Sequence, residues 1–375
     1  MSVAALVHRL RWPRLVPVLA ALGALAWAVT VPTPAPPSAP APQGPPRLAD
    51  AWPSATVTTF AAEMAGGYTF RPLLMVSGTL SFGLATGPDF SRSQLMLRST
   101  DDRIRVLRTY LGRERPSVIG EALAGSDLFW LETGPSASGQ RETVLWRASV
   151  DGGEAVVLAR DSSDVLYYDT TYDLQVVDGQ VVWAAVGPAN GNTEQSGEIR
   201  AVPVGGGPVT VRTLDRLYAL TAWPWVTTPT STAHTSSELL NLVTGERRVA
   251  PAGANEILSC SPAWCRVTTL INRGQSLTVD MQHFDGTARR RVGGPTLMPI
   301  NSDVALVDRF EVLGSVGPAA TTSQQLWLHD LTDERLVLFA ESNDAAIGSR
   351  GTFLWWSTGN NETTTWHVVN LTDLR

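Results

Sequence analysis

The sequence is built from a series of similar units, each of roughly 46 residues. Every unit predicts a first strand, a very apolar second strand, a variable loop, a third strand, a tight turn and a fourth strand. A short four-stranded sheet that is apolar on both faces must pack against neighbours on both sides. The apolar second strands are predicted at residues 80–86, 128–133, 181–186, 223–228, 263–270, 309–315 and 352–357.

The last unit, residues 344–375, contains only three predicted strands, at residues 345–348, 352–357 and 365–370. A fourth strand is missing where every earlier unit has one. Residues 54–61 (SATVTTFA), at the other end of the repetitive region, are rich in the β-branched and aromatic residues that favour strands. We expect this N-terminal strand to complete the last sheet and thereby close a ring.

The sequence therefore predicts an all-β fold, a seven-bladed β-propeller with four-stranded blades, over residues 52–375. Six or eight blades would follow if one unit is misassigned. The weakest units are the first and residues 223–251, where Pro224 and Pro229 interrupt the strand pattern.

One unit also resembles a known type of repeat. Residues 145–159 (LWRASVDGGEAVVLA) combine an apolar third strand, an Asp-Gly-Gly turn and a fourth strand that ends in a small residue. This pattern resembles the repeat of TolB-like bacterial propellers, and the resemblance covers residues 54–375 as a degenerate pattern. It implies a fold more than an activity, because propellers of this kind host binding proteins, peptidases and lyases.

The N-terminal residues predict export from the cytoplasm. Residues 1–14 are basic and contain no acid, and residues 15–31 (LVPVLAALGALAWAVTV) are uncharged. This order is typical of a single transmembrane helix with a cytoplasmic tail and the propeller outside the cytoplasm. A cleaved signal peptide is the alternative, since Ala24, Ala26 and Ala28 offer small-residue cleavage sites, and the protein would then be secreted.

Residues 32–51 predict a linker between this segment and the propeller. The segment is rich in proline, which fixes φ and lacks a backbone donor, so we expect an extended polyproline II conformation. A semi-rigid spacer of this kind would hold the propeller away from the membrane.

The two cysteines, Cys260 and Cys265, lie at the ends of two predicted strands joined by a turn that contains Pro262. We expect a disulfide across this hairpin, which agrees with export, because disulfides persist in oxidising compartments. Two unpaired thiols are the alternative. A zinc site is disfavoured, since zinc takes four ligands and no histidine is close in sequence.

Composition and motifs exclude several classes of function. The net charge of −6 argues against nucleic acid as a partner, because phosphate-backbone binding needs a basic surface. The sequence has no G-x-S-x-G nucleophile turn, no glycine-rich loop before a helix and no convincing calcium loop. We therefore expect no catalytic residue, no metal and no cofactor.

One stretch stands out as a candidate ligand-binding site: residues 161–173 (DSSDVLYYDTTYD). It joins the fourth strand of the second unit to the first strand of the third, and we expect it at the face where the central funnel opens. Tyrosines offer flat contact area with a polar tip, and carboxylates accept hydrogen bonds. The alternative is an ordinary blade-to-blade link whose tyrosines pack on neighbours. The candidate residues are Asp164, Tyr167, Tyr168, Asp169, Tyr172 and Asp173.

These features favour a membrane-tethered binding or scaffold module for a protein, peptide or glycan of the cell envelope. The alternative is a cell-wall polysaccharide-active enzyme, a hydrolase or lyase, with carboxylates at the funnel. That enzyme would need two acids that converge within about 5–10 Å. A purely structural role is a third hypothesis.

Overall fold

The computed structural model describes residues 44–112, 116–136, 139–189, 195–229, 236–316, 323–343, 345–360 and 363–375. The helix predicted at residues 15–31 and most of the predicted linker lie outside the described residues. Among the described residues, no helix has both the length and the apolar character needed to cross a membrane.

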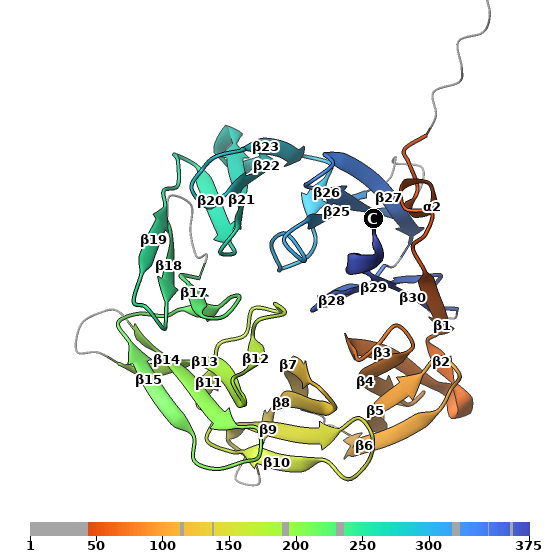
Figure 1. Ribbon diagram of the computed structural model, residues 1–375. Helices are drawn as coiled ribbons and strands as arrows, with labels where there is room; N and C mark the ends of the chain where they lie inside the picture. Colours follow the sequence, from red (N-terminus) through yellow and green to blue (C-terminus); the bar gives the residue numbers. More distant parts are fainter. Residues whose placement is uncertain are drawn as a thin grey trace, which may run out of the picture. The chain divides into compact units, whose positions relative to one another are not determined.

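Residues Pro45–Arg375 form seven antiparallel sheets arranged in a ring, which confirms the seven-bladed propeller (Figure 1). In blade 2, for example, the first strand lies nearest the centre of the ring and the last strand lies at the rim. The predicted strands at residues 80–86 and 365–370 coincide with observed strands to the residue.

The first three blades follow the predicted order of strands, with extra short strands in blades 1 and 3. Blade 1 contains β2 (Glu63–Met64), β3 (Tyr68–Met75), β4 (Leu80–Thr86), β5 (Arg92–Ser99) and β6 (Ile104–Leu111). Blade 2 contains β7 (Ser117–Ala124), β8 (Asp127–Pro135), β9 (Arg141–Ser149) and β10 (Val156–Ala159). Blade 3 contains β11 (Asp164–Val165), β12 (Leu174–Val177), β13 (Gln180–Ala189), β14 (Gln195–Pro203) and β15 (Thr210–Leu214).

The other four blades each have four strands. Blade 4 contains β16 (Ala219–Leu220), β17 (Trp225–Thr227), β18 (Ser237–Asn241) and β19 (Arg247–Ala250). Blade 5 contains β20 (Glu256–Cys260), β21 (Trp264–Ile271), β22 (Ser276–His283) and β23 (Arg290–Gly293). Blade 6 contains β24 (Met298–Pro299), β25 (Phe310–Val316), β26 (Gln324–Asp330) and β27 (Arg335–Ser342). Blade 7 contains β28 (Ile347–Arg350), β29 (Phe353–Thr358), β30 (Thr365–Asn370) and β1 (Val57–Ala61).

The hydrophobic core consists of seven clusters, one between each pair of neighbouring blades. Phe82 of β4 and Trp130 of β8, for example, are both fully buried, and their ring centroids are 5.3 Å apart. Trp183 of β13 is fully buried in the cluster between blades 2 and 3. Because each second strand is apolar on both faces, only packing against two neighbours removes it from water.

The chain closes the ring as predicted, because β1 pairs with β30 at the rim of blade 7. Thr58 is opposite Val368, and Phe60 is opposite Trp366. The cluster between blades 7 and 1 contains Phe60 together with residues from both ends of the repetitive region.

A further attachment precedes β1. Residues 46–52, which include helix α2 (Leu48–Ala51), pack against blade 6. The Leu338 N–H of β27 donates to the Pro46 carbonyl at 3.0 Å. Trp52 is fully buried, with its ring 5.8 Å from that of Phe310. The chain is thus fixed to blade 6 before it enters blade 7.

The disulfide between Cys260 and Cys265 is confirmed, with an S–S distance of 2.05 Å. The two residues are opposite each other in the pairing of β20 with β21, across the predicted hairpin.

Candidate functional site

The centre of the ring is crossed by residues 166–173, which we call the crossing loop. This loop lies between β11 and β12, and both of these strands pair with β13. It therefore interrupts the inner strand of blade 3. The expectation of a simple blade-to-blade link at one face needs correction, because the preceding β11 is already part of the blade.

Asp173 holds the shape of the crossing loop from within. Its carboxylate accepts hydrogen bonds from the Tyr168 and Thr170 backbone N–H groups, at 3.1 and 2.8 Å, and from the Thr170 hydroxyl at 3.1 Å. Asp173 is only 3% exposed, and burial raises the pKa of its carboxyl to about 6, although the N–H donors oppose this shift.

The far side of the crossing loop is bonded to blades 6 and 7. The Asp169 carboxylate accepts from the Arg350 guanidinium at 3.1 Å. The Thr171 N–H donates to Asp303 at 2.9 Å, and its hydroxyl accepts from the Gly351 N–H at 2.8 Å. The loop thus links blade 3 to the opposite side of the channel.

The crossing loop separates two cavities. Tyr168, Thr170 and Tyr172 line a cavity of about 270 Å³, which we call the hydroxyl pocket. Tyr167 and Asp169 line a second cavity of about 190 Å³, which we call the arginine pocket. Neighbouring side chains of one loop therefore serve different cavities.

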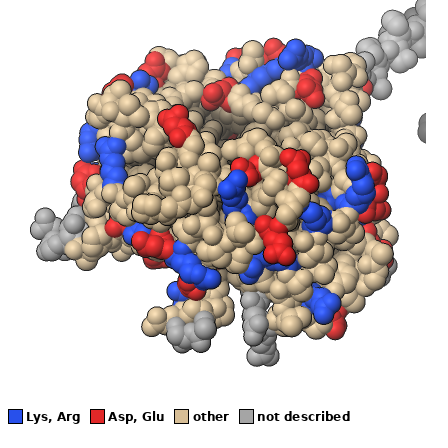
Figure 2. All heavy atoms as spheres, turned by 60° about the horizontal axis from the view of Figure 1, so that its bottom comes forward, with Lys and Arg blue, Asp and Glu red and all other residues tan. Residues whose placement is uncertain are grey.

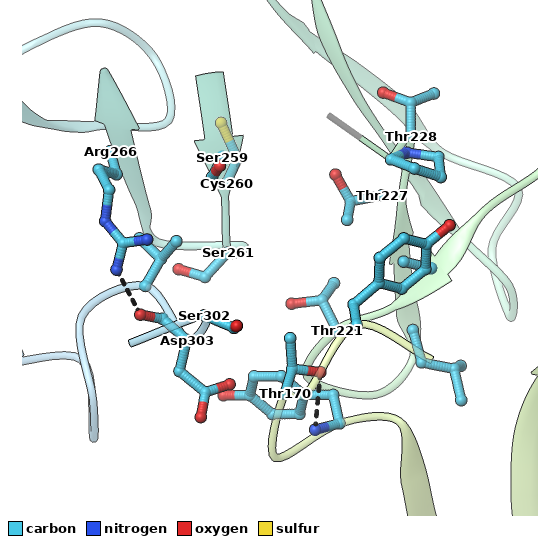
Figure 3. Close-up of a pocket in the computed structure, with 16 residues that line it drawn as sticks. Thr170, Thr221, Thr227, Thr228, Ser259, Cys260, Ser261, Arg266, Ser302 and Asp303 are labelled. Atoms are coloured by element: carbon cyan, nitrogen blue, oxygen red, sulfur yellow. Dashed lines mark hydrogen bonds between the residues drawn. The ribbon is translucent and has the colours of Figure 1, made fainter. Parts of the chain in front are cut away.

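Hydroxyl-bearing residues from the crossing loop and blades 4, 5 and 6 line the hydroxyl pocket, together with apolar residues such as Leu220 and Val304 (Figure 3). Figure 3 shows these side chains around one common space. Hydroxyls both donate and accept hydrogen bonds, so this wall can pair with a ligand of the same kind. The hydroxyl-bearing residues are Tyr168, Thr170, Tyr172, Thr221, Thr227, Thr228, Ser259, Ser261 and Ser302.

The charged residues of the hydroxyl pocket are already paired. Arg266 donates to Glu311 and to the Asp303 carbonyl, both at 2.5 Å. The Asp303 carboxylate accepts from Thr171 and from the Ser349 hydroxyl, and burial raises the pKa of this carboxyl. The hydroxyls of Thr170, Thr228 and Ser261 also have partners within the protein, and each keeps further hydrogen-bonding capacity because a hydroxyl both donates and accepts.

Two tyrosines bring aromatic surface to this pocket. Tyr168 is 37% exposed, and neither its phenol oxygen nor that of Tyr172 has a hydrogen-bond partner among the described residues. Burial, and next the Asp303 carboxylate, raise the pKa of Tyr172 to about 12, so its hydroxyl keeps its proton at neutral pH. Both phenols can donate a hydrogen bond to a ligand.

The arginine pocket is organised by Arg350 of β28, which is 9% exposed. Its guanidinium donates to Glu121 of β7 at 3.2 Å and to Asp169 at 3.1 Å. The Tyr167 hydroxyl donates to the same Asp169 carboxylate at 2.8 Å. Burial raises the pKa of the Glu121 carboxyl, and Arg350 opposes this shift.

The predicted site residues divide into four groups. Tyr168 and Tyr172 line the hydroxyl pocket, and Tyr167 and Asp169 line the arginine pocket. Asp173 is a buried support of the loop. Asp164 is exposed on β11 and lines neither pocket.

Sequence reasoning missed the partners that other blades supply. Arg350, Asp303 and Glu121 lie in different blades, in units with no local motif. Arg350 and Asp169 are 181 residues apart in sequence. Only the ring brings them together, so no spacing in the sequence could have indicated them.

The part of the chain that the structure describes gives little support to a metal site or to nucleic-acid binding. Within it, no three His, Cys, Asp or Glu side chains group in a way that could hold a metal ion. Figure 2 shows basic and acidic side chains interspersed over one face of the molecule, without a large patch of either sign. This face therefore offers no basic surface of the kind that nucleic acids require.

Neither the protein-family models nor the curated protein sequences give a match to this chain. Similar solved structures include an acylaminoacyl peptidase, with 9% identity and a TM-score of 0.47. They also include the β-propeller domain of the Trilobed protease from Pyrococcus furiosus, with 8% identity and a TM-score of 0.41. A Synechocystis apocarotenoid oxygenase matches with 10% identity and a TM-score of 0.40.

These matches cover different shares of the proteins. The peptidase match covers 80% of this chain and 49% of the peptidase, and the oxygenase match covers 62% of this chain and 63% of the oxygenase. The match to the Trilobed protease domain covers 66% of this chain and 79% of that domain. At such low identity and TM-score, these likenesses say nothing about the activity or ligand of this chain.

Proposed function

We propose that this protein is a binding module that takes a glycan residue in the hydroxyl pocket. The observation that carries the proposal is the wall of hydroxyl side chains around a cavity of about 270 Å³, with its two charged residues already paired. Sugar hydroxyls need partners that both donate and accept, and the tyrosine rings offer flat surface for a sugar ring.

The size of the pocket supports a small group rather than a folded surface. Pockets for drug-sized ligands measure roughly 300–1,000 Å³, so a cavity of about 270 Å³ suits one ring or one side chain of a larger chain. A glycan is favoured over a charged peptide side chain, because Arg266 and Asp303 already have partners and offer no free charge to such a side chain.

The proposal also includes the cellular location of the protein. The uncharged segment at residues 15–31 supports a single-pass anchor in the cell membrane, with the propeller outside the cytoplasm and a glycan of the cell envelope as partner. Secretion after cleavage is the alternative. The turn at Asp151-Gly152-Gly153 supports a TolB-like repeat. Cell fractionation and the mass of the mature protein would distinguish anchoring from cleavage.

The polysaccharide-active enzyme receives less support. Glu121 and Asp169 do converge, but both are bonded to the Arg350 guanidinium. A carboxylate neutralised in this way is a poor general acid or base. The enzyme alternative predicts that labelled cell-wall polysaccharide is cleaved, and that Glu121→Gln abolishes the cleavage.

The proposal is tested with purified full-length protein on an array of neutral oligosaccharides, followed by titration calorimetry with each oligosaccharide that binds. We expect Tyr168→Ala to weaken binding by roughly tenfold, because it removes both the ring and the hydroxyl. Tyr168→Phe should retain most of the affinity.

Phe90→Ala is the matched control, since Phe90 is an aromatic residue of a surface loop, 75% exposed and away from the pocket. Binding of no neutral oligosaccharide would overturn the proposal. So would equal affinities of the Tyr168→Ala and Phe90→Ala variants for an oligosaccharide that does bind.

A further inference from the structure

The arginine pocket contains a second cation, Arg71, to which the described residues give no ion pair. Arg71 lies on β3, the inner strand of blade 1, and its exposed side chain lines this pocket. Among the described residues, its guanidinium has no ion pair and no hydrogen bond that would hold it. It therefore differs from Arg350, which donates to Glu121 and Asp169.

The two carboxylates of the pocket are both engaged by Arg350. Asp169 also accepts from the Tyr167 hydroxyl, and Glu121 is buried on β7, away from water. Burial raises the pKa of Glu121, and the charges of Arg350 and Arg71 oppose this shift. The pocket thus holds two guanidinium groups, and of these only Arg350 is hydrogen-bonded to its carboxylates.

The remaining walls restrict what could enter. The pocket has a volume of about 190 Å³, and the indole-bearing residues Trp355 and Trp366 are among the residues that line it. A small planar anion that arginine can grip with two parallel hydrogen bonds fits these walls. A carboxylate meets this description.

We propose that the arginine pocket binds the carboxylate of an acidic sugar, with Arg71 as the residue that recognises it. The choice of a sugar acid over other carboxylates rests on the proposed glycan function of the adjacent hydroxyl pocket. The crossing loop would then contact an acidic glycan on both of its sides. The hydroxyl pocket would bind hydroxyl groups of the glycan, and the arginine pocket would bind its carboxylate.

The experiment uses titration calorimetry of full-length protein with D-glucuronate, and with D-glucose as the neutral counterpart. We expect glucuronate to bind more tightly than glucose. Arg71→Ala should lower the affinity for glucuronate by at least about tenfold, as expected when a hydrogen bond to a charged group is lost. Arg71→Lys should restore part of the affinity, because it keeps the charge without the two-pronged geometry.

Arg92→Ala is the matched control, because Arg92 is also an exposed arginine of blade 1 and does not line the pocket. Equal affinities of the Arg71→Ala and Arg92→Ala variants for glucuronate would overturn the proposal, and so would equal binding of glucose and glucuronate. If N-acetylalanine binds tightly and glucuronate does not, the proposal of an acidic sugar is wrong and the ligand is the C-terminal carboxylate of a peptide.

The two proposals can fail separately. If neutral oligosaccharides bind and glucuronate does not, the hydroxyl pocket keeps its function and the inference about Arg71 is wrong. If glucuronate binds through Arg71 and neutral oligosaccharides do not bind, the proposed function of the hydroxyl pocket is wrong.

Discussion

Asp173 is subject to two opposing effects on the protonation of its carboxyl. It accepts three hydrogen bonds from the crossing loop, which favour its charged form, and it is almost fully buried, which favours its neutral form. Burial has the larger effect, so the pKa of the folded protein is about 6 compared with an ordinary value of 3.8. The residue that shapes the site therefore also couples folding to pH.

This coupling predicts a decrease in stability as the pH rises from about 4 to about 6. Below this range Asp173 is protonated in both the folded and the unfolded protein. Within it the unfolded chain releases the proton while the folded protein keeps it, so unfolding becomes easier as the pH rises. The pKa difference corresponds to about 3 kcal/mol of unfolding free energy. Asp173→Asn should remove this contribution.

The measurement is urea unfolding of wild type and variant across this pH range. The difference between the two curves isolates Asp173 from other acids, such as Asp330, whose pKa is lowered by its hydrogen bonds with Arg309. Asp164→Asn is the control, since Asp164 is exposed on β11. A constant difference between wild type and Asp173→Asn at every pH would contradict the prediction.

At the scale of single elements, the hairpin of β20 and β21 carries the covalent link of the chain, and Cys260 also lines the hydroxyl pocket. The bond closes a loop with a sequence separation of 5, so it restricts the unfolded chain only modestly. Replacing both cysteines, Cys260→Ala with Cys265→Ala, should therefore lower the unfolding free energy by roughly 2 kcal/mol.

Urea unfolding under oxidising conditions measures this loss. Wild-type protein treated with a reductant serves as the control and should lose a similar amount of stability. If oxidised wild type, reduced wild type and the double variant unfold at the same urea concentration, the bond does not contribute to stability.

The crossing loop also shows which parts of a site the sequence can predict. The cluster of aspartates and tyrosines at residues 161–173 is visible in the sequence, and four of the six candidate residues do line a cavity. Its place inside an inner strand was not visible, because β11 has only two residues and carries no strand pattern. Its partners Arg350 and Asp303 come from other blades, and only the closed ring brings them close.

At the scale of the whole molecule, the fold was predictable because the same physical pattern recurs in every blade. Apolar second strands such as β4 and β29 must be covered on both faces, and tight turns such as Asp151-Gly152-Gly153 mark where each sheet folds back. The role of residues 46–52 was not predictable, because a proline-rich composition indicates a linker. The burial of Trp52 depends on a surface of blade 6 that the local sequence does not reveal.

Closure of the ring by residues 45–61 leads to a prediction about the whole propeller. These residues place Trp52 and Phe60 in two different inter-blade clusters and supply β1 to blade 7. Loss of one large buried aromatic side chain costs about 3–5 kcal/mol, and total stability is typically about 5–15 kcal/mol. A chain that lacks residues 1–61 should therefore lose cooperative thermal unfolding, whereas a chain that lacks only residues 1–44 should melt within a few degrees of the full-length protein. Calorimetry would compare the thermal unfolding of the full-length protein with that of the two shortened chains. A cooperative transition in the shorter variant, at the temperature of the full-length protein, would show that the other blades form a stable array without closure.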